Sequence, residues 1–118
     1  MYLSQIYYIY FHFGSHTISE ISAFHNVTNG CNQLFPREIT AHLGNEKHAV
    51  RCCNNIQATC SSPDPCQLSS TFTEAENICS QQGLTLCSRQ QNLDSICCKT
   101  GCEIDDVTMW IADDSKSK

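Results

Sequence analysis

The sequence has little positive charge, and its basic residues are scattered along the chain. Seven Lys and Arg stand against twelve Asp and Glu, which gives a formal net charge of −5 at pH 7. A nucleic-acid-binding surface needs Lys and Arg gathered in a patch that neutralises phosphates. A helix that binds at a membrane surface needs a basic amphipathic face. The composition therefore disfavours binding to nucleic acid or to membrane surfaces.

The short motifs of common enzyme classes are missing as well. The chain has no G-x-S-x-G, no H-E-x-x-H, no P-loop and no G-x-G-x-x-G. A nucleophilic cysteine would need a low-pKa thiolate and a positioned base, and the cysteines are better explained as disulfides (below). We predict that the protein is not an enzyme and has no cofactor.

Metal-binding patterns are also scarce. No C-x-x-C occurs, although metal sites favour pairs spaced two to four residues apart. Two of the five histidines have helical i, i+4 spacing but lie near the N-terminus, and two others fall on predicted strands. We expect them to be ordinary surface or strand residues and predict no metal site; the five are His12, His16, His25, His42 and His48.

Long apolar runs are absent too. Residues 1–13 (MYLSQIYYIYFHF) are uncharged and mostly apolar, but a membrane-spanning helix needs about 20 such residues. We therefore predict no membrane insertion by this segment. A signal peptide over residues 1–22 is one alternative, although no basic region opens it and no A-x-A site follows. A fragment edge explains the segment equally well, and both alternatives stay open.

Cysteine, in contrast, is abundant. Ten of the 118 residues are cysteine, a density typical of disulfide scaffolds. Disulfides persist in oxidising compartments and are rare in the cytosol. The sequence thus predicts an extracellular or cell-surface location in which every cysteine is bridged: Cys31, Cys52, Cys53, Cys60, Cys66, Cys79, Cys87, Cys97, Cys98 and Cys102.

Cysteine positions also suggest the domain limits. Nine cysteines lie between Cys52 and Cys102, and an odd number cannot close all its own bridges. Cys31 makes the number even. We therefore place a cysteine-rich module at 31–112, a leader, linker or fragment edge at 1–30, and a polar tail at 113–118.

The local patterns within the module predict an α+β fold with two helices packed on a small antiparallel sheet. One helix is expected to begin at Thr73 with a T-x-x-E capping box to Glu76 and to end at Gly83, after which Leu84 folds back onto the helix. A second is expected to begin at Ser88 with a capping box to Gln91. Alternating apolar residues predict strands at 38–43, 49–53 and 107–111.

From Phe72 onwards the order of motifs resembles the C-type-lectin-like fold, in particular its short Link-type variant. The matching strings are FTEAENIC (72–79), QQGLTLCS (81–88) and CKTGCEIDDVTMW (98–110). With HAVRCC (48–53), the series also resembles a module found in surface proteins of aquatic microbes and invertebrates. The resemblance implies a Cys79–Cys98 bridge, as between the first helix and the C-x-x-G motif of Link domains.

The resemblance also shows what this chain lacks. The E-P-N or Q-P-D and W-N-D motifs of calcium-dependent lectins are absent, and the second helix runs almost directly into Thr100-Gly101-Cys102. The fold is therefore expected without the long calcium loop. The leading hypothesis is a non-catalytic recognition module that binds a glycan or an extracellular protein, as in adhesion. A structural spacer without a ligand, and a secreted inhibitor or toxin-like domain, are the alternatives.

Two other pairings are expected, the first of them from loop closure. Cys60 and Cys66 bracket the turn-rich stretch SSPDP and are predicted to bridge each other, and Cys87 is predicted to bridge Cys102. Adjacent strand residues point to opposite faces, so Cys52 and Cys53 should serve different bridges.

Three other kinds of candidate residue remain. Asn26 begins an N-glycosylation sequon. The acids Glu103, Asp105 and Asp106 could bind calcium, but a solvated loop in which Asp105 accepts a backbone hydrogen bond is the expected alternative. Trp110, the single tryptophan, is expected to pack in the core rather than to form an exposed ligand platform.

Overall fold

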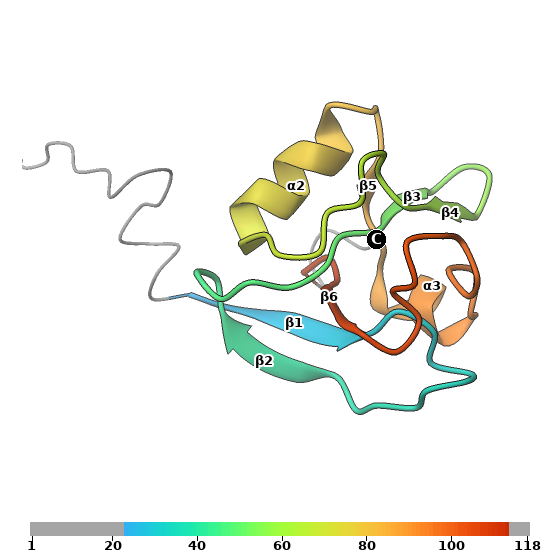
Figure 1. Cartoon of the computed structure of the whole chain (residues 1–118), viewed down its shortest axis with the longest axis horizontal. Coiled ribbons are helices and arrows are strands. Elements are labelled where there is room, and N and C mark those ends of the chain that lie inside the picture. Colours follow the sequence, from blue (N-terminus) through green and yellow to red (C-terminus); the bar gives the residue numbers. More distant parts are fainter. Residues whose placement is uncertain (1–22, 114–118) are drawn as a thin grey trace, which may run out of the picture.

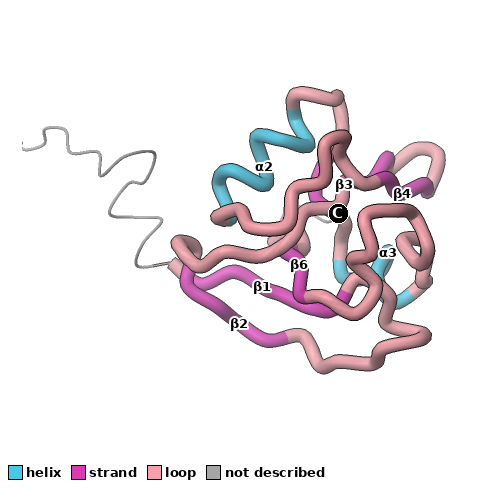
Figure 2. The backbone as a smooth tube through the Cα atoms, in the orientation of Figure 1, coloured by secondary structure: helices cyan, strands magenta, loops and turns pink. Residues whose placement is uncertain are grey.

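The computed structural model describes residues 23–113, which form two small antiparallel sheets and two helices (Figures 1 and 2). The α+β class is confirmed, whereas the single sheet expected from sequence is wrong. One sheet has the order β2-β1-β6, with β2 at Thr40–Leu43, β1 at Phe24–Asn29 and β6 at Thr108–Trp110. The other has the order β4-β3-β5, with β4 at Thr59–Ser61, β3 at Cys52–Asn54 and β5 at Thr85–Leu86.

Strand β1 lies in the centre of the first sheet, in a segment that the sequence had placed outside the module. Val27 pairs with Thr40 of β2 on one side and with Trp110 of β6 on the other. The folded unit therefore starts before Cys31. The expected start was wrong because it was taken from the cysteines, and β1 contains none. Residues 1–22, for which a signal peptide and a fragment edge were the alternatives, lie outside the described residues, as does most of the predicted tail (114–118).

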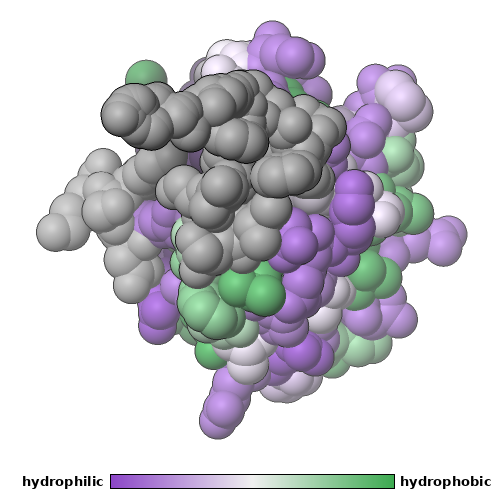
Figure 3. All heavy atoms as spheres, turned by 90° about the vertical axis from the view of Figure 1, so that its left-hand side faces the viewer, coloured by the Kyte–Doolittle hydropathy of each residue, from purple (hydrophilic) through white to green (hydrophobic). Residues whose placement is uncertain are grey.

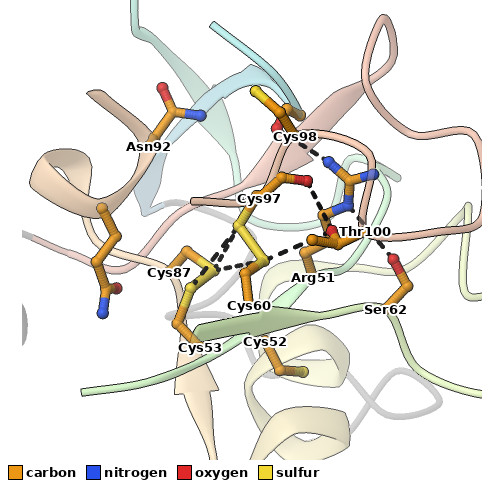
Figure 4. The surroundings of a disulfide bond; sticks show 12 residues. Arg51, Cys52, Cys53, Cys60, Ser62, Cys87, Asn92, Cys97, Cys98 and Thr100 are labelled. Atoms are coloured by element: carbon orange, nitrogen blue, oxygen red, sulfur yellow. Dashed lines mark hydrogen bonds between the residues drawn. A yellow bond between two sulfur atoms is a disulfide. The ribbon is translucent and has the colours of Figure 1, made fainter. Parts of the chain in front are cut away.

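Strand β3 places its two cysteines on opposite faces, as predicted. Cys52 bridges Cys79 on helix α2 (Phe72–Ser80), and Cys53 bridges Cys87 just after β5. Figure 4 shows the two side chains leaving the strand in opposite directions. The two sheets are joined next to β3, where Ala49 forms a parallel bridge with Met109 of β6.

Helix α2 begins earlier than its predicted capping box implied. Its N-cap is Thr71, whose hydroxyl accepts a hydrogen bond from the Glu74 N–H at 3.3 Å, while the Glu74 carboxylate accepts one from the Thr71 N–H at 2.9 Å. The T-x-x-E pattern occurs twice in overlap, and the earlier copy brings Phe72 into the first turn, where it is 3% exposed. Burial of an aromatic ring explains the choice.

The ends of the helices otherwise follow the local signals. Gly83 has a positive φ of 72°, and the Leu84 N–H donates to the Cys79 carbonyl at 2.9 Å, so Leu84 folds back as expected. Helix α3 (Arg89–Leu93) begins with the predicted capping box between Ser88 and Gln91. Neither helix of the part that the structure describes is long and apolar enough to cross a bilayer.

The core is divided between two clusters that meet at β6. Trp110 packs with Val27 and Phe72 in one cluster, while Met109 and Ile111 belong to the other. Successive residues of a strand point to opposite faces, and here both faces are covered. Trp110 is fully buried, which confirms the predicted core position.

Every cysteine is bridged in the structure. The three pairings predicted from sequence, Cys79–Cys98, Cys60–Cys66 and Cys87–Cys102, are all wrong. The first of these pairings was implied by the resemblance and the second was expected from loop closure. The sequence does not give the direction in which each cysteine side chain points, and the observed bridges join cysteines 27 to 67 positions apart. The observed pairs are Cys31–Cys98, Cys52–Cys79, Cys53–Cys87, Cys60–Cys97 and Cys66–Cys102.

Two of these bridges stack against each other in the core. Cys53–Cys87 and Cys60–Cys97 lie side by side, with 3.3 Å between the sulfurs of Cys87 and Cys97 (Figure 4). The stack joins β3, β4, the end of β5 and the segment after α3. Four sulfurs therefore fill space that apolar side chains would occupy in a larger core.

Candidate functional site

The loop between β1 and β2 meets the segment after α3 at an open hollow of about 550 Å³. Figure 1 shows these two segments side by side, the first in cyan and the second in orange-red. They are held together by backbone hydrogen bonds, among them Cys31 N–H to Asp105 O at 3.0 Å and Gly30 N–H to Val107 O at 3.1 Å. The hollow is lined by Leu34, Phe35, Arg51, Lys99, Gly101, Cys102, Glu103, Asp105 and Asp106.

Arg51 forms the base of this hollow, and its side chain is only 1% exposed. Its guanidinium donates to the Gly30 carbonyl at 2.9 Å and to the Gly101 carbonyl at 3.0 Å, and it pairs with an Asp105 carboxylate oxygen at 2.9 Å. A further bond reaches the Ser62 hydroxyl at 3.3 Å. The planar, multiply donating guanidinium thus ties together segments that are far apart in sequence.

The close approach of Arg51 explains the residue at position 30. A Cβ at Gly30 would overlap the Ile104 carbonyl oxygen and lie 2.8 Å from Arg51 Nη1. Only glycine leaves room for both contacts. Gly30 therefore allows the end of β1 to lie in close contact with the loop that carries Asp105.

Asp105 accepts a backbone hydrogen bond, as the alternative to a calcium site predicted. In addition to Arg51, the Lys99 N–H donates to its carboxylate at 3.1 Å. The other two acids of the predicted set, Glu103 and Asp106, are exposed at the rim of the hollow. Asp105 is thus a structural anchor of the loop, and the rim carries the free acidic side chains.

The backbone of this loop is unusual. Lys99, Cys102 and Glu103 have positive φ values of 61°, 62° and 55°, and Gly101 lies between them at 102°. Each non-glycine residue in this region costs on the order of 1 kcal/mol or more, so such residues persist where surrounding structure holds them. The Cys31–Cys98 and Cys66–Cys102 bridges hold the loop on both sides of Gly101. The two bridges therefore constrain the loop at the rim of the hollow.

Exposed apolar side chains line the same hollow as the acidic Glu103 and Asp106. Leu34 is 51% exposed and Phe35 is 41% exposed, and the charged Lys99 lies on the same hollow. An aromatic surface with adjacent charges of both signs suits the packing of a sugar ring or of a protein side chain. Leu34 and Phe35 could not be identified as site residues from the sequence, because nothing near them in the chain marks their proximity to residues 99–106.

A second cluster of polar residues lies where β2 ends. His42 Nδ1 is 2.8 Å from Glu46 Oε1, and His48 Nε2 is 3.4 Å from the same oxygen. The hydrogen bond from His42 lowers the pKa of Glu46. Burial lowers the pKa of His48, so its neutral form is favoured. Both histidines were expected to be ordinary strand or surface residues, although a glutamate stands between them in the chain.

The remaining histidine in the described part packs against the core. The His25 ring stacks on Phe72 with 3.6 Å between ring centroids, and its Nδ1 is 2.8 Å from an Asp113 carboxylate oxygen. The neighbouring sequon residue Asn26 lies on β1 and is partly buried, while Thr28 of the sequon is fully buried. Glycosylation at Asn26 stays a prediction.

Comparisons with protein families, curated proteins and solved structures found no significant match to this chain. What is established is a small disulfide-rich α+β unit whose five bridges are typical of extracellular proteins.

Proposed function

We propose that this chain is a non-catalytic recognition module of an extracellular or cell-surface protein, and that it binds a glycan or a protein through the Arg51 hollow. The observation that carries the proposal is the pairing of an exposed apolar surface, Leu34 and Phe35, with a loop held rigid by two disulfides. Preorganised surfaces bind well because little conformational entropy is lost on binding.

The same hollow fits the resemblance to C-type-lectin-like modules. The strings that carry the resemblance include TGC (100–102), of which Gly101 and Cys102 line the hollow. We propose that the module belongs to that superfamily and that the short loop after α3 takes over recognition from the missing calcium loop. Rigidity then comes from the Cys66–Cys102 bridge instead of from a bound ion.

Binding to a glycan array and to a panel of extracellular proteins, with the folded and fully oxidised chain, tests this proposal. We expect at least one ligand whose affinity falls by about tenfold or more in the double variant Leu34→Ser, Phe35→Ser, because truncated anchor residues at an interface centre typically cost about 2 kcal/mol. The variant should keep its near-ultraviolet circular dichroism, since neither side chain is buried in the core.

Ile56→Ser is the matched control. Ile56 is 95% exposed in the turn between β3 and β4, so this variant also removes a surface apolar group. It should leave the affinity unchanged. Equal weakening by both variants, or no binding in either screen by a well-folded sample, would contradict recognition through the hollow and favour a structural spacer.

A further inference from the structure

The cluster at the end of β2 brings two imidazoles onto one carboxylate. Glu46 Oε1 faces Nδ1 of His42 at 2.8 Å and Nε2 of His48 at 3.4 Å. One nitrogen from each histidine and one oxygen from the glutamate all lie within 4.8 Å of one another. In a tetrahedral zinc site with bonds of about 2.0–2.1 Å, ligand atoms are about 3.3 Å apart. The 3.4 Å separation of His48 and Glu46 already matches this spacing. The 2.8 Å separation of His42 and Glu46 is that of a direct hydrogen bond, which a bound ion would replace with a spacing about 0.5 Å longer.

The nitrogen on the far side of each ring is held by a threonine. His42 Nε2 is hydrogen-bonded to the Thr40 hydroxyl at 2.9 Å, and His48 Nδ1 to the Thr108 hydroxyl at 2.7 Å. Metal-ligating histidines almost always place their second nitrogen in such a bond, which orients the ring and fixes its tautomer. Both rings are therefore oriented so that their remaining nitrogens face Glu46.

The rings are also supported by packing. The ring centroids of His42 and His48 are 4.9 Å apart, and His48 stands against the buried ring of Trp110 at 4.8 Å. The side chain of His48 is 10% exposed and that of His42 is 24% exposed, whereas Glu46 is 45% exposed. The cluster thus has a fixed inner side and a side open to solvent. Figure 3 views the molecule from the side at which β2 ends, where hydrophilic residues cover much of the coloured surface.

The nearest cationic side chain on the same turn points elsewhere. Lys47 Nζ lies 3.7 Å from a Glu74 carboxylate oxygen at the start of α2, so its ammonium is engaged away from the imidazoles. Arg37, whose charge opposes protonation of His48, has an exposed side chain. The acidic net charge of the chain, −5, favours cations further.

We propose that His42, Glu46 and His48 form a binding site for a divalent transition-metal ion, with zinc the best match to two imidazoles and one carboxylate. Neutral imidazole suits zinc, copper and nickel, whereas calcium and magnesium prefer oxygen ligands. Three protein ligands leave a fourth position for water on the exposed side. The site is separate from the Arg51 hollow and does not depend on the function proposed for it.

Isothermal titration of the full, oxidised chain with Zn²⁺ tests the proposal, with Co²⁺ absorption as a report on ligand geometry. We expect one Zn²⁺ per chain at this site and a visible Co²⁺ spectrum typical of a four-coordinate centre. Glu46→Gln and His42→Gln should each weaken Zn²⁺ binding by about tenfold or more and change the Co²⁺ spectrum. Both side chains are partly exposed, so these variants should remain folded, as near-ultraviolet circular dichroism would verify.

Two further variants separate this site from other sources of zinc affinity. His12→Asn with His16→Asn removes the other histidine pair with ligand spacing and should leave the His42 site intact. Thr40→Val removes a ring partner without removing a ligand and should weaken binding by about tenfold. Absence of Zn²⁺ binding by the oxidised chain, or binding that survives Glu46→Gln and His42→Gln but is lost with His12 and His16, would overturn the proposal.

Discussion

Arg51→Met is expected to lower the free energy of unfolding by about 3–5 kcal/mol, the usual cost of removing one partner of a buried ion pair. The substitution removes four hydrogen bonds, one of which is the ion pair to Asp105. The Gly30 carbonyl accepts from Arg51 in a buried position and would lose that partner, which adds to the cost. Guanidinium denaturation of the oxidised chain measures the change.

A second variant separates the contribution of the Arg51–Asp105 ion pair to stability from that of the other Arg51 hydrogen bonds. Asp105→Asn keeps the size of the side chain and retains an oxygen that can accept from the Lys99 N–H, so it should cost less than Arg51→Met. The control is Arg37→Met, because the Arg37 side chain is exposed and such surface changes usually stay within about 0.5 kcal/mol. Equal stabilities for Arg51→Met and Arg37→Met would show that Arg51 does not hold the hollow together.

Trp110→Ala is expected to cost a similar amount, about 3–5 kcal/mol. The ring is fully buried and makes edge-to-face contacts with Phe72 at 5.5 Å and with His48 at 4.8 Å between centroids. Its Nε1–H donates to the Ser70 carbonyl at 2.7 Å. The variant would leave a cavity between α2 and the first sheet, and chemical denaturation should report the loss.

Trp110→Phe keeps an aromatic ring but removes the N–H donor. The Ser70 carbonyl still accepts from the His48 N–H at 2.9 Å, so the lost bond should cost only about 1 kcal/mol beyond the change in packing. Ile56→Ala, at a position 95% exposed, is the control and should be nearly neutral. If Trp110→Ala were as mild as Ile56→Ala, the tryptophan would belong on the surface and not in the core.

Features set by neighbouring residues could be predicted from the sequence. Where a motif occurs twice, however, the sequence did not show which occurrence is used. The Ser88 capping box and the turn at Gly83 were located correctly, because each depends on residues within one helical turn. The box at the start of α2 was misplaced by two residues because Thr71-x-x-Glu74 and Thr73-x-x-Glu76 both fit the pattern. Burial of Phe72 decides between them, and burial is a property of the fold.

Features that join distant segments could not be predicted. The disulfide pairs depend on which strand face each cysteine occupies, and the spacing of cysteines carries no such information. Arg51 was missed as the base of the hollow because arginine is rarely buried without a partner, and its partner Asp105 is 54 positions away. The histidine cluster forms only because the turn after β2 returns His48 to the side of His42.

Peptide mapping of the oxidised chain by mass spectrometry, without reduction, tests the central claim that this disulfide frame builds the module and its hollow. The vicinal pairs Cys52-Cys53 and Cys97-Cys98 cannot be separated by proteolysis, so stepwise reduction and alkylation at acidic pH must resolve them. The expected pairs are Cys31–Cys98, Cys52–Cys79, Cys53–Cys87, Cys60–Cys97 and Cys66–Cys102. A Cys79–Cys98 or Cys60–Cys66 bridge, or free thiols at most positions, would contradict the account.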